Sequence, residues 1–295
     1  MPARPDRFDA DLATREARQK ATSVHAKHVP PGLPVCPFAL AEKRRIPVKR
    51  SSTLPSGIIG RLDYVGGEIP VQVTLVEGFG TEEMIRFTLA HEIGHYHLDG
   101  HFEVLFSDGR TSHVGGGEFA SDAIHERQAD AFASELLMPK TDCLRLLKDI
   151  PSDDDGLVAI LALAKSCQVS IHAAANRYID LVERPTALVV SQDGKVLYCA
   201  RSRELKQRQG RNAEYITKGS SLPAHSFAAR MTPAEVAARK RPAATDDRWD
   251  AWFGGGDRGE IQQEALGLGS YGKVITVLSA NDWDAEGNDD DACED

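Results

Sequence analysis

The chain has 295 residues, 41% hydrophobic and 27% charged, which is enough for two or three domains with a hydrophobic core. Its longest apolar run, residues 157–164, is too short to span a membrane, and the first residues lack the apolar segment of a signal peptide. Five scattered cysteines without a Cys-x-x-Cys pair argue against disulfides and thiolate zinc sites, so we expect a cytoplasmic protein without membrane contact.

The formal net charge of −9 is concentrated at one end of the chain. Residues 282–295 carry eight carboxylates and no lysine or arginine. Subtracting these eight from the 44 acidic residues leaves 36 against 35 basic residues, so the rest of the chain is nearly neutral. We predict a disordered acidic tail over 282–295.

The N-terminal part predicts a helix followed by strands. Residues 8–28 are expected to be helical, and Pro30-Pro31-Gly32 ends that helix. Residues 58–76 suggest two strands around Gly66-Gly67. Because the amides of an edge strand can bind an extended peptide, we expect part of 58–65 to pair with substrate.

The most informative motif is His91-Glu92-Ile93-Gly94-His95, which follows a helix start signal at Thr81. On a helix, positions i and i+4 lie on the same face, so both histidines can hold one metal ion. Glu92 then lies beside the metal but outside its coordination shell, as a general base for the bound water must.

A catalytic zinc ion needs a third protein ligand, and several residues could supply it. His101 occupies the place of the third metzincin histidine, but Leu98 stands where that motif needs a glycine. His97 points to the other side of the helix. We favour Glu126, because small residues one and two turns along its helix allow close packing. Two neighbours of Glu126 stay open as alternatives: Asp122 and His125.

Asp130 follows Glu126 by one helical turn. At that place its carboxylate could accept a hydrogen bond from a ligand histidine and fix the orientation of the ring, so Asp130 is the candidate for an outer, orienting residue.

Residues 86–95 and 126–139 together resemble the ImmA/IrrE metallopeptidases, over about residues 36–140. The resemblance implies a zincin-like fold in which His91, His95 and Glu126 bind zinc, or manganese in the cell, with Glu92 as the catalytic base. It also implies a protein substrate, a helix-turn-helix repressor, whose cleavage derepresses stress-response or transfer genes. The Leu98–Ser121 connection, with Gly115-Gly116-Gly117 and extra histidines, departs from the family and leaves a lid, disorder, a second metal or altered specificity open.

Beyond Pro139, residues 157–166 and 171–182 predict a helix-turn-helix-like pair. The second helix offers Arg177 as its one basic residue, whereas DNA binding needs clustered positive charge. Direct DNA binding is therefore the less favoured use of this pair, and a structural or substrate-docking role is preferred.

Arg184-Pro185 marks the next boundary. Asp193-Gly194 between two β-rich runs predicts a hairpin, with later strands at 261–266 and 273–278. The basic stretch 201–211 is expected to be a solvated loop, and Trp249, Trp252 and Phe253 are expected in a core. By analogy with one branch of the ImmA/IrrE family, this part would be a small α/β, GAF-like sensor.

The overall prediction is an α+β protein with four parts. They are a zinc metallopeptidase domain (1–140), a helix-turn-helix-like helical domain (141–184), a small α/β domain (185–281) and the tail (282–295). The predicted function is that of a zinc-dependent endopeptidase acting on a helix-turn-helix repressor. The alternative is a metal-stabilised regulator that binds a repressor or DNA without cutting.

Overall fold

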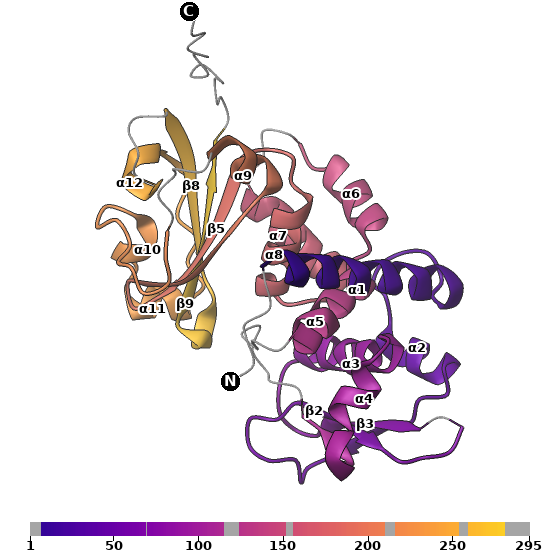
Figure 1. Ribbon diagram of the computed structural model, residues 1–295. Helices are drawn as coiled ribbons and strands as arrows, with labels where there is room; N and C mark the ends of the chain where they lie inside the picture. Colours follow the sequence, from indigo (N-terminus) through magenta and orange to yellow (C-terminus); the bar gives the residue numbers. More distant parts are fainter. Residues whose placement is uncertain are drawn as a thin grey trace, which may run out of the picture. The chain divides into compact units, whose positions relative to one another are not determined.

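The computed structural model describes residues 7–68, 70–114, 124–151, 156–209, 216–253 and 259–280 (Figure 1). The predicted acidic tail and Asp122 lie outside these residues. The described residues fall into two compact units. The first takes them from Met1–Leu147 and Leu163–Ala173, and the second from Lys148–Ala162 and Ala174–Asp295. The domain boundaries expected from the sequence stay predictions.

The first unit combines helices with short strands. In chain order they are α1 (Arg7–His28), α2 (Pro37–Lys43), β1 (Val48–Ser51), β2 (Gly60–Tyr64), β3 (Val71–Val76), α3 (Glu82–His97), α4 (His101–Leu105), the 3₁₀ turn η1 (Ser107–Gly109), β4 (Ser112–His113), α5 (Ile124–Leu137) and α6 (Lys140–Lys148). The helix expected over 8–28 and the two strands expected around Gly66-Gly67 are therefore confirmed.

Helix α3 lies between helix α5 and a sheet, and α1 packs on the other side of α5 (Figure 1). The contacting face of α1 is made of small residues at helical spacing, Ala13, Ala17 and Ala21, all buried. Small side chains let helix axes approach closely, so α5 is held between α1 and α3. The two central helices of this unit are the ones that carry the predicted metal ligands.

The sheet of the first unit has the strand order β1-β3-β2-β4. Strand β3 is an inner, largely buried strand, parallel to β1 and antiparallel to β2. Short β4 pairs with β2 at Leu62↔His113 and Asp63↔Ser112. Because β4 pairs with Leu62 and Asp63, these two residues are not at a free sheet edge, and the pairing of part of 58–65 with substrate stays a prediction.

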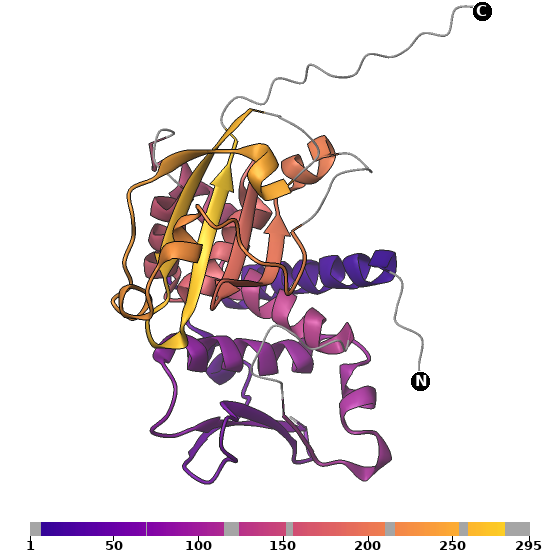
Figure 2. The same cartoon turned by 90° about the vertical axis from the view of Figure 1, so that its left-hand side faces the viewer.

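The second unit is built on a five-stranded sheet of order β6-β5-β9-β8-β7 (Figure 2). Its strands are β5 (Thr186–Gln192), β6 (Lys195–Arg201), β7 (Thr245–Arg248), β8 (Glu260–Gly267) and β9 (Lys273–Ser279), all paired antiparallel. The helices of this part of the chain are α9 (Arg203–Gln209), α10 (Phe227–Arg230), α11 (Pro233–Ala237) and α12 (Trp249–Phe253), with the 3₁₀ turn η2 (Gly269–Tyr271). Helices α7 (Gly156–Cys167) and α8 (Ile171–Leu181) contribute residues to both units.

The predicted hairpin is confirmed as β5 and β6. Both turn residues, Asp193 and Gly194, have positive φ values of 50° and 72°, the combination that a type I′ turn requires. The central strands β5 and β9 are buried on both faces. Trp249, Trp252 and Phe253 lie in the core on one side of this sheet, as expected.

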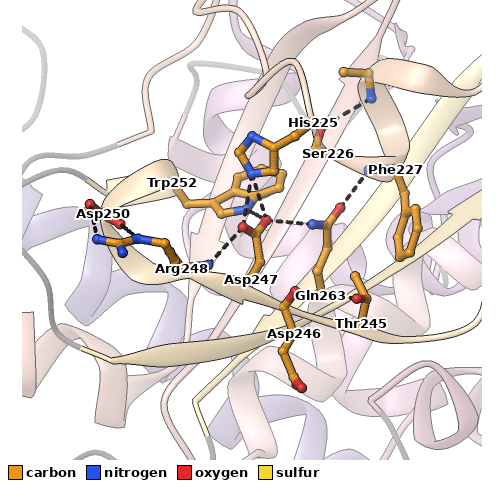
Figure 3. A network of polar contacts seen from close by, with 11 residues as sticks. His225, Ser226, Phe227, Thr245, Asp246, Asp247, Arg248, Asp250, Trp252 and Gln263 are labelled. Atoms are coloured by element: carbon orange, nitrogen blue, oxygen red, sulfur yellow. Dashed lines mark hydrogen bonds and ion pairs between the residues drawn. The ribbon is translucent and has the colours of Figure 1, made fainter.

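A polar network around Asp247 ties β7, α12, β8 and the start of α10 together (Figure 3). The Asp247 carboxylate lies 2.9 Å from His225 Nε2 and accepts hydrogen bonds from Trp252 Nε1 at 2.8 Å and Gln263 Nε2 at 2.7 Å. Gln263 Oε1 in turn accepts from the amide of Phe227 at 2.7 Å. One carboxylate thus joins segments that are distant in sequence, so the network has a structural role in the second unit.

Three expectations from composition can be compared with the structure. No single helix among the described residues is long and apolar enough to cross a membrane, although α7 and α8 pass that test as a bent pair. The four cysteines in the described ranges form no disulfide. The basic stretch expected as a loop is instead partly the helix α9, so that expectation is wrong for Arg203–Gln209.

Candidate metal centre

Helix α3 presents the two histidines of the motif. It begins where the Thr81 hydroxyl accepts a hydrogen bond from the amide of Met84 at 3.3 Å, and it ends at Leu98, which is extended. His91 and His95 lie one turn apart on the buried side of this helix, with 6% and 0% of their surface exposed. Their Nε2 atoms are 3.0 Å apart, so both rings turn the same nitrogen toward one point.

Helix α5 brings Glu126 to that point. Gly94 of α3 makes the approach of the two helices close, because a Cβ atom there would lie 3.1 Å from Phe132 Cδ1 of α5. The Glu126 side chain is buried, with Oε2 3.5 Å from His91 Nε2 and Oε1 3.5 Å from His95 Nε2. Ligand atoms of His91, His95 and Glu126 all lie within 4.8 Å of one another.

The donor set fits a divalent metal ion. In a tetrahedral zinc site with metal–ligand distances near 2.05 Å, neighbouring ligand atoms are about 3.3 Å apart. Here the two Nε2 atoms are 3.0 Å apart, and each lies 3.5 Å from a different oxygen of Glu126, so the carboxylate faces both rings. Two imidazole nitrogens and a carboxylate are also a ligand combination of catalytic zinc sites, which keep the fourth position for water.

Glu92 lies beside this cluster and is fully buried. Within the described part of the chain, neither of its carboxylate oxygens has a hydrogen-bond partner. Burial raises the pKa of Glu92 to about 7, although the positive charge of His91 and His113 opposes that shift. A carboxyl group that titrates near neutrality can both take and return a proton, which suits a general base.

The surroundings shift the pKa values of the three candidate ligands, His91, His95 and Glu126. Burial alone lowers the pKa of His91, but hydrogen bonds with Asp130 and Glu126 outweigh it and raise that pKa to about 10. Burial and the nearby His91 hold the pKa of His95 well below its usual value. Burial raises the pKa of Glu126, but hydrogen bonds from His113 and His91 prevail and lower it.

The Nδ1 atoms of the two motif histidines contact different side chains. The Nδ1 atom of His91 lies 2.9 Å from Asp130 Oδ1, the contact that the sequence suggested for Asp130. The Nδ1 atom of His95 lies 2.8 Å from Nδ1 of His101. His101 therefore lies behind His95, on the side away from Glu126, and does not complete the ligand set as a third histidine.

The other candidate residues take separate positions. His113 of β4 and His125 of α5 approach Glu126 Oε1 with their Nε2 atoms at 3.0 and 3.6 Å. His97 points away from the cluster and stacks on Phe132. His113 was not predicted to lie beside Glu126, because its place depends on the pairing of β4 with β2, and a strand of two residues leaves no signal in the sequence.

An α+β fold in which two helices bring a His-Glu-x-x-His motif and a glutamate together beside a sheet is the arrangement of a metallopeptidase-like domain. Residues 80–178 match the family described as IrrE N-terminal-like domain. The predicted resemblance to the ImmA/IrrE family is therefore confirmed for that segment, which contains all four of His91, Glu92, His95 and Glu126.

Comparison with solved structures finds chains with a similar fold. A solved chain described as "Mycobacterium tuberculosis transcriptional regulator" aligns with a TM-score of 0.54 over 91% of this chain and 76% of that chain. The sequences are 14% identical, so this likeness concerns the fold alone. No curated protein matches the sequence.

Proposed function

We propose that this protein is a zinc-dependent endopeptidase in which His91, His95 and Glu126 hold the metal and Glu92 is the catalytic base. The observation that carries the proposal is the convergence of the buried residues His91, His95 and Glu126, whose ligand atoms all lie within 4.8 Å of one another, next to a buried carboxylate without a hydrogen-bond partner among the described residues. The IrrE N-terminal-like match over 80–178 supports a metallopeptidase. Manganese is the alternative metal in the cell.

The chemistry divides between the metal and the chain. A divalent ion held by His91, His95 and Glu126 would lower the pKa of a water molecule and polarise a carbonyl group. Glu92 would take a proton from the water as its oxygen bonds to the carbonyl carbon, and would deliver that proton to the amine as the C–N bond breaks. In the metal-free protein, burial raises the pKa of Glu92 to about 7. His113 and His125 are the candidates nearest to Glu126 for contacting the carbonyl oxygen.

The substrate proposal rests on the family resemblance. We infer that the protein cleaves a helix-turn-helix repressor in the cytoplasm and so derepresses stress-response genes. In this proposal the first unit has a zincin-like fold, and the sheet of the second unit serves as a GAF-like sensor. Direct DNA binding through α7 and α8 is the less favoured use of that helix pair.

The test is intact-mass analysis of the helix-turn-helix repressor encoded nearest this gene, after incubation with the zinc-loaded protein. We expect one defined cut. Glu92→Gln should retain zinc and lower turnover by at least about a hundredfold, because a positioned base contributes that much. Glu126→Gln should lose zinc as well as activity, and Glu77→Gln, an exposed loop carboxylate in the same unit, should change neither.

Two results would overturn the proposal. The first is full turnover by Glu92→Gln, which would remove the assigned base. The second is an intact repressor that forms a stable complex with the zinc-loaded protein. That outcome would favour the alternative, a metal-stabilised regulator that acts by binding.

A further inference from the structure

The partner of His95 is unusual because it is a second, fully enclosed imidazole. His95 and His101 are 0% and 2% exposed, and their Nδ1 atoms are 2.8 Å apart. Since both atoms are ring nitrogens, one must carry a hydrogen and the other must offer a lone pair. Which of the two donates is determined by what each ring does with its other nitrogen.

The other nitrogen of each ring fixes the direction. His95 Nε2 faces His91 and Glu126, and as a metal ligand it must offer its lone pair, so the hydrogen of this ring is on Nδ1. His101 must then accept at Nδ1 and carry its own hydrogen on Nε2. That atom lies 3.1 Å from the carbonyl oxygen of the Gln128 side chain, which can only accept.

The chain of hydrogen bonds continues to the backbone. With its oxygen accepting from His101, the Gln128 side chain has its amide nitrogen free to donate, and this Nε2 atom donates to the carbonyl oxygen of Ala13 in α1 at 3.5 Å. All three links have the same direction, from His95 through His101 and Gln128 to Ala13. At every step the donating group carries a hydrogen and the accepting group offers a lone pair.

The local backbone explains why His101 lies behind His95. Helix α3 ends at Leu98, and Gly100 has a φ of +79°, the left-handed region that favours glycine. The chain turns there and begins the short helix α4 with His101 as its first residue. A metzincin-type turn would come two residues earlier and bring the histidine to the metal, whereas this later turn brings it to the far side of the ligand ring.

We propose that His101 is a positioning residue that holds His95 in the tautomer and ring orientation required to bind the metal, with Gln128 holding His101. The inference rests on the proposed function, since it assigns a partner to one of its ligands. The two ligands are then supported differently. His91 has a carboxylate behind it, whereas His95 has a neutral imidazole connected to a side-chain amide and a backbone carbonyl.

The first test compares variants by zinc affinity and by the visible spectrum of the cobalt-substituted protein. His101→Phe keeps a ring but removes the acceptor, and loss of such a partner lowers metal affinity by about 10–100-fold. His101→Asn should recover most of that loss, because its Oδ1 atom can take the place of Nδ1. The matched control is His97→Phe, the same substitution two residues from His95 at a ring that stacks on Phe132 and not on the cluster.

A cobalt spectrum altered in His101→Phe, and restored in His101→Asn, is the signature of changed ligand geometry. Thermal unfolding of each variant shows whether it is folded, and the Asn variant keeps the test valid if the Phe variant is not. His101→Phe that folds with unchanged affinity and spectrum would overturn the inference. Wild-type protein that binds no metal would instead overturn the proposed function.

The second test observes the tautomers directly. Long-range ¹H–¹⁵N correlation spectra of the zinc-loaded, histidine-labelled protein distinguish a protonated from an unprotonated ring nitrogen. We expect His101 as the Nε2–H form and His95 as the Nδ1–H form. A hydrogen on Nδ1 of His101 would reverse the chain and contradict the inference, whatever the affinities are.

Discussion

Replacement of Glu92 by glutamine should stabilise the metal-free protein, and only above acidic pH. The pKa of Glu92 is raised from 4.5 to about 7, so the folded state disfavours the ionised carboxylate. Because the pKa of Glu92 is higher in the folded than in the unfolded protein, the free energy of unfolding is highest below pH 4.5 and falls as the pH rises through 7. At about 1.4 kcal/mol for each pKa unit, the loss reaches about 3 kcal/mol by pH 8. Glutamine has nearly the same shape and stays neutral, so it avoids this loss.

The assay is urea denaturation in the presence of a chelator between pH 4.5 and 8, followed by far-UV circular dichroism. The first unit contains no tryptophan, so circular dichroism is needed to follow it, whereas Trp249 and Trp252 report on the second unit by fluorescence. We expect the free energy of unfolding of Glu92→Gln to exceed that of wild type by about 3 kcal/mol at pH 8 and by almost nothing at pH 4.5.

The control is Glu77→Gln, whose carboxylate is exposed in the same unit. It should show no such dependence on pH, and the fluorescence transition should be the same in all three proteins. If Glu92→Gln is no more stable than wild type at pH 8, or if its advantage is the same at every pH, the raised pKa is wrong. Glu92 would then not be a base whose pKa lies near neutrality.

Three further substitutions test the packing and polar contacts that hold the two units. Gly94→Ala should lower the free energy of unfolding by about 1 kcal/mol, because overpacking against Phe132 outweighs the gain in helix propensity. The double variant with Phe132→Leu should regain this lost stability. Circular dichroism measures both effects. Asp247→Ala removes the carboxylate that contacts His225 and accepts from Trp252, Gln263 and the amide of Arg248, and should cost about 3 kcal/mol, seen as an earlier tryptophan transition. Arg86→Met removes a buried guanidinium that donates to the carbonyl oxygens of Val35 and Gln168, and should cost about 3 kcal/mol in the first unit. An effect under about 0.5 kcal/mol, the range of ordinary surface substitutions, would contradict the role given to the residue concerned.

Local signals in the sequence predicted the elements whose structure is determined locally. The Asp193-Gly194 pair predicted its hairpin because few other residues tolerate two consecutive positive φ values. The spacing of His91 and His95 placed both on one helix face, since helical periodicity alone determines that. Glu126 was favoured because small residues follow it at helical spacing, and the structure brings its carboxylate to the two imidazoles.

Contacts between distant segments could not be predicted in the same way. The position of His113 depends on a two-residue strand, and that of His101 depends on the turn at Gly100. Helix α9 was expected as a loop because its charged sequence has no clear apolar face, although Leu205 anchors it in the core of the second unit. For His113 and α9 the deciding interaction is formed with residues far away in the chain, whereas the turn at Gly100 is local.

The most direct test of the central claim is anomalous diffraction at the zinc edge from crystals of the zinc-loaded protein. We predict one peak for each chain, coordinated by His91 Nε2, His95 Nε2 and a carboxylate oxygen of Glu126, with the Glu92 carboxylate near the metal but outside its ligand shell. A peak coordinated by His101 or His113 in place of Glu126, or no peak at this cluster, would contradict the claim.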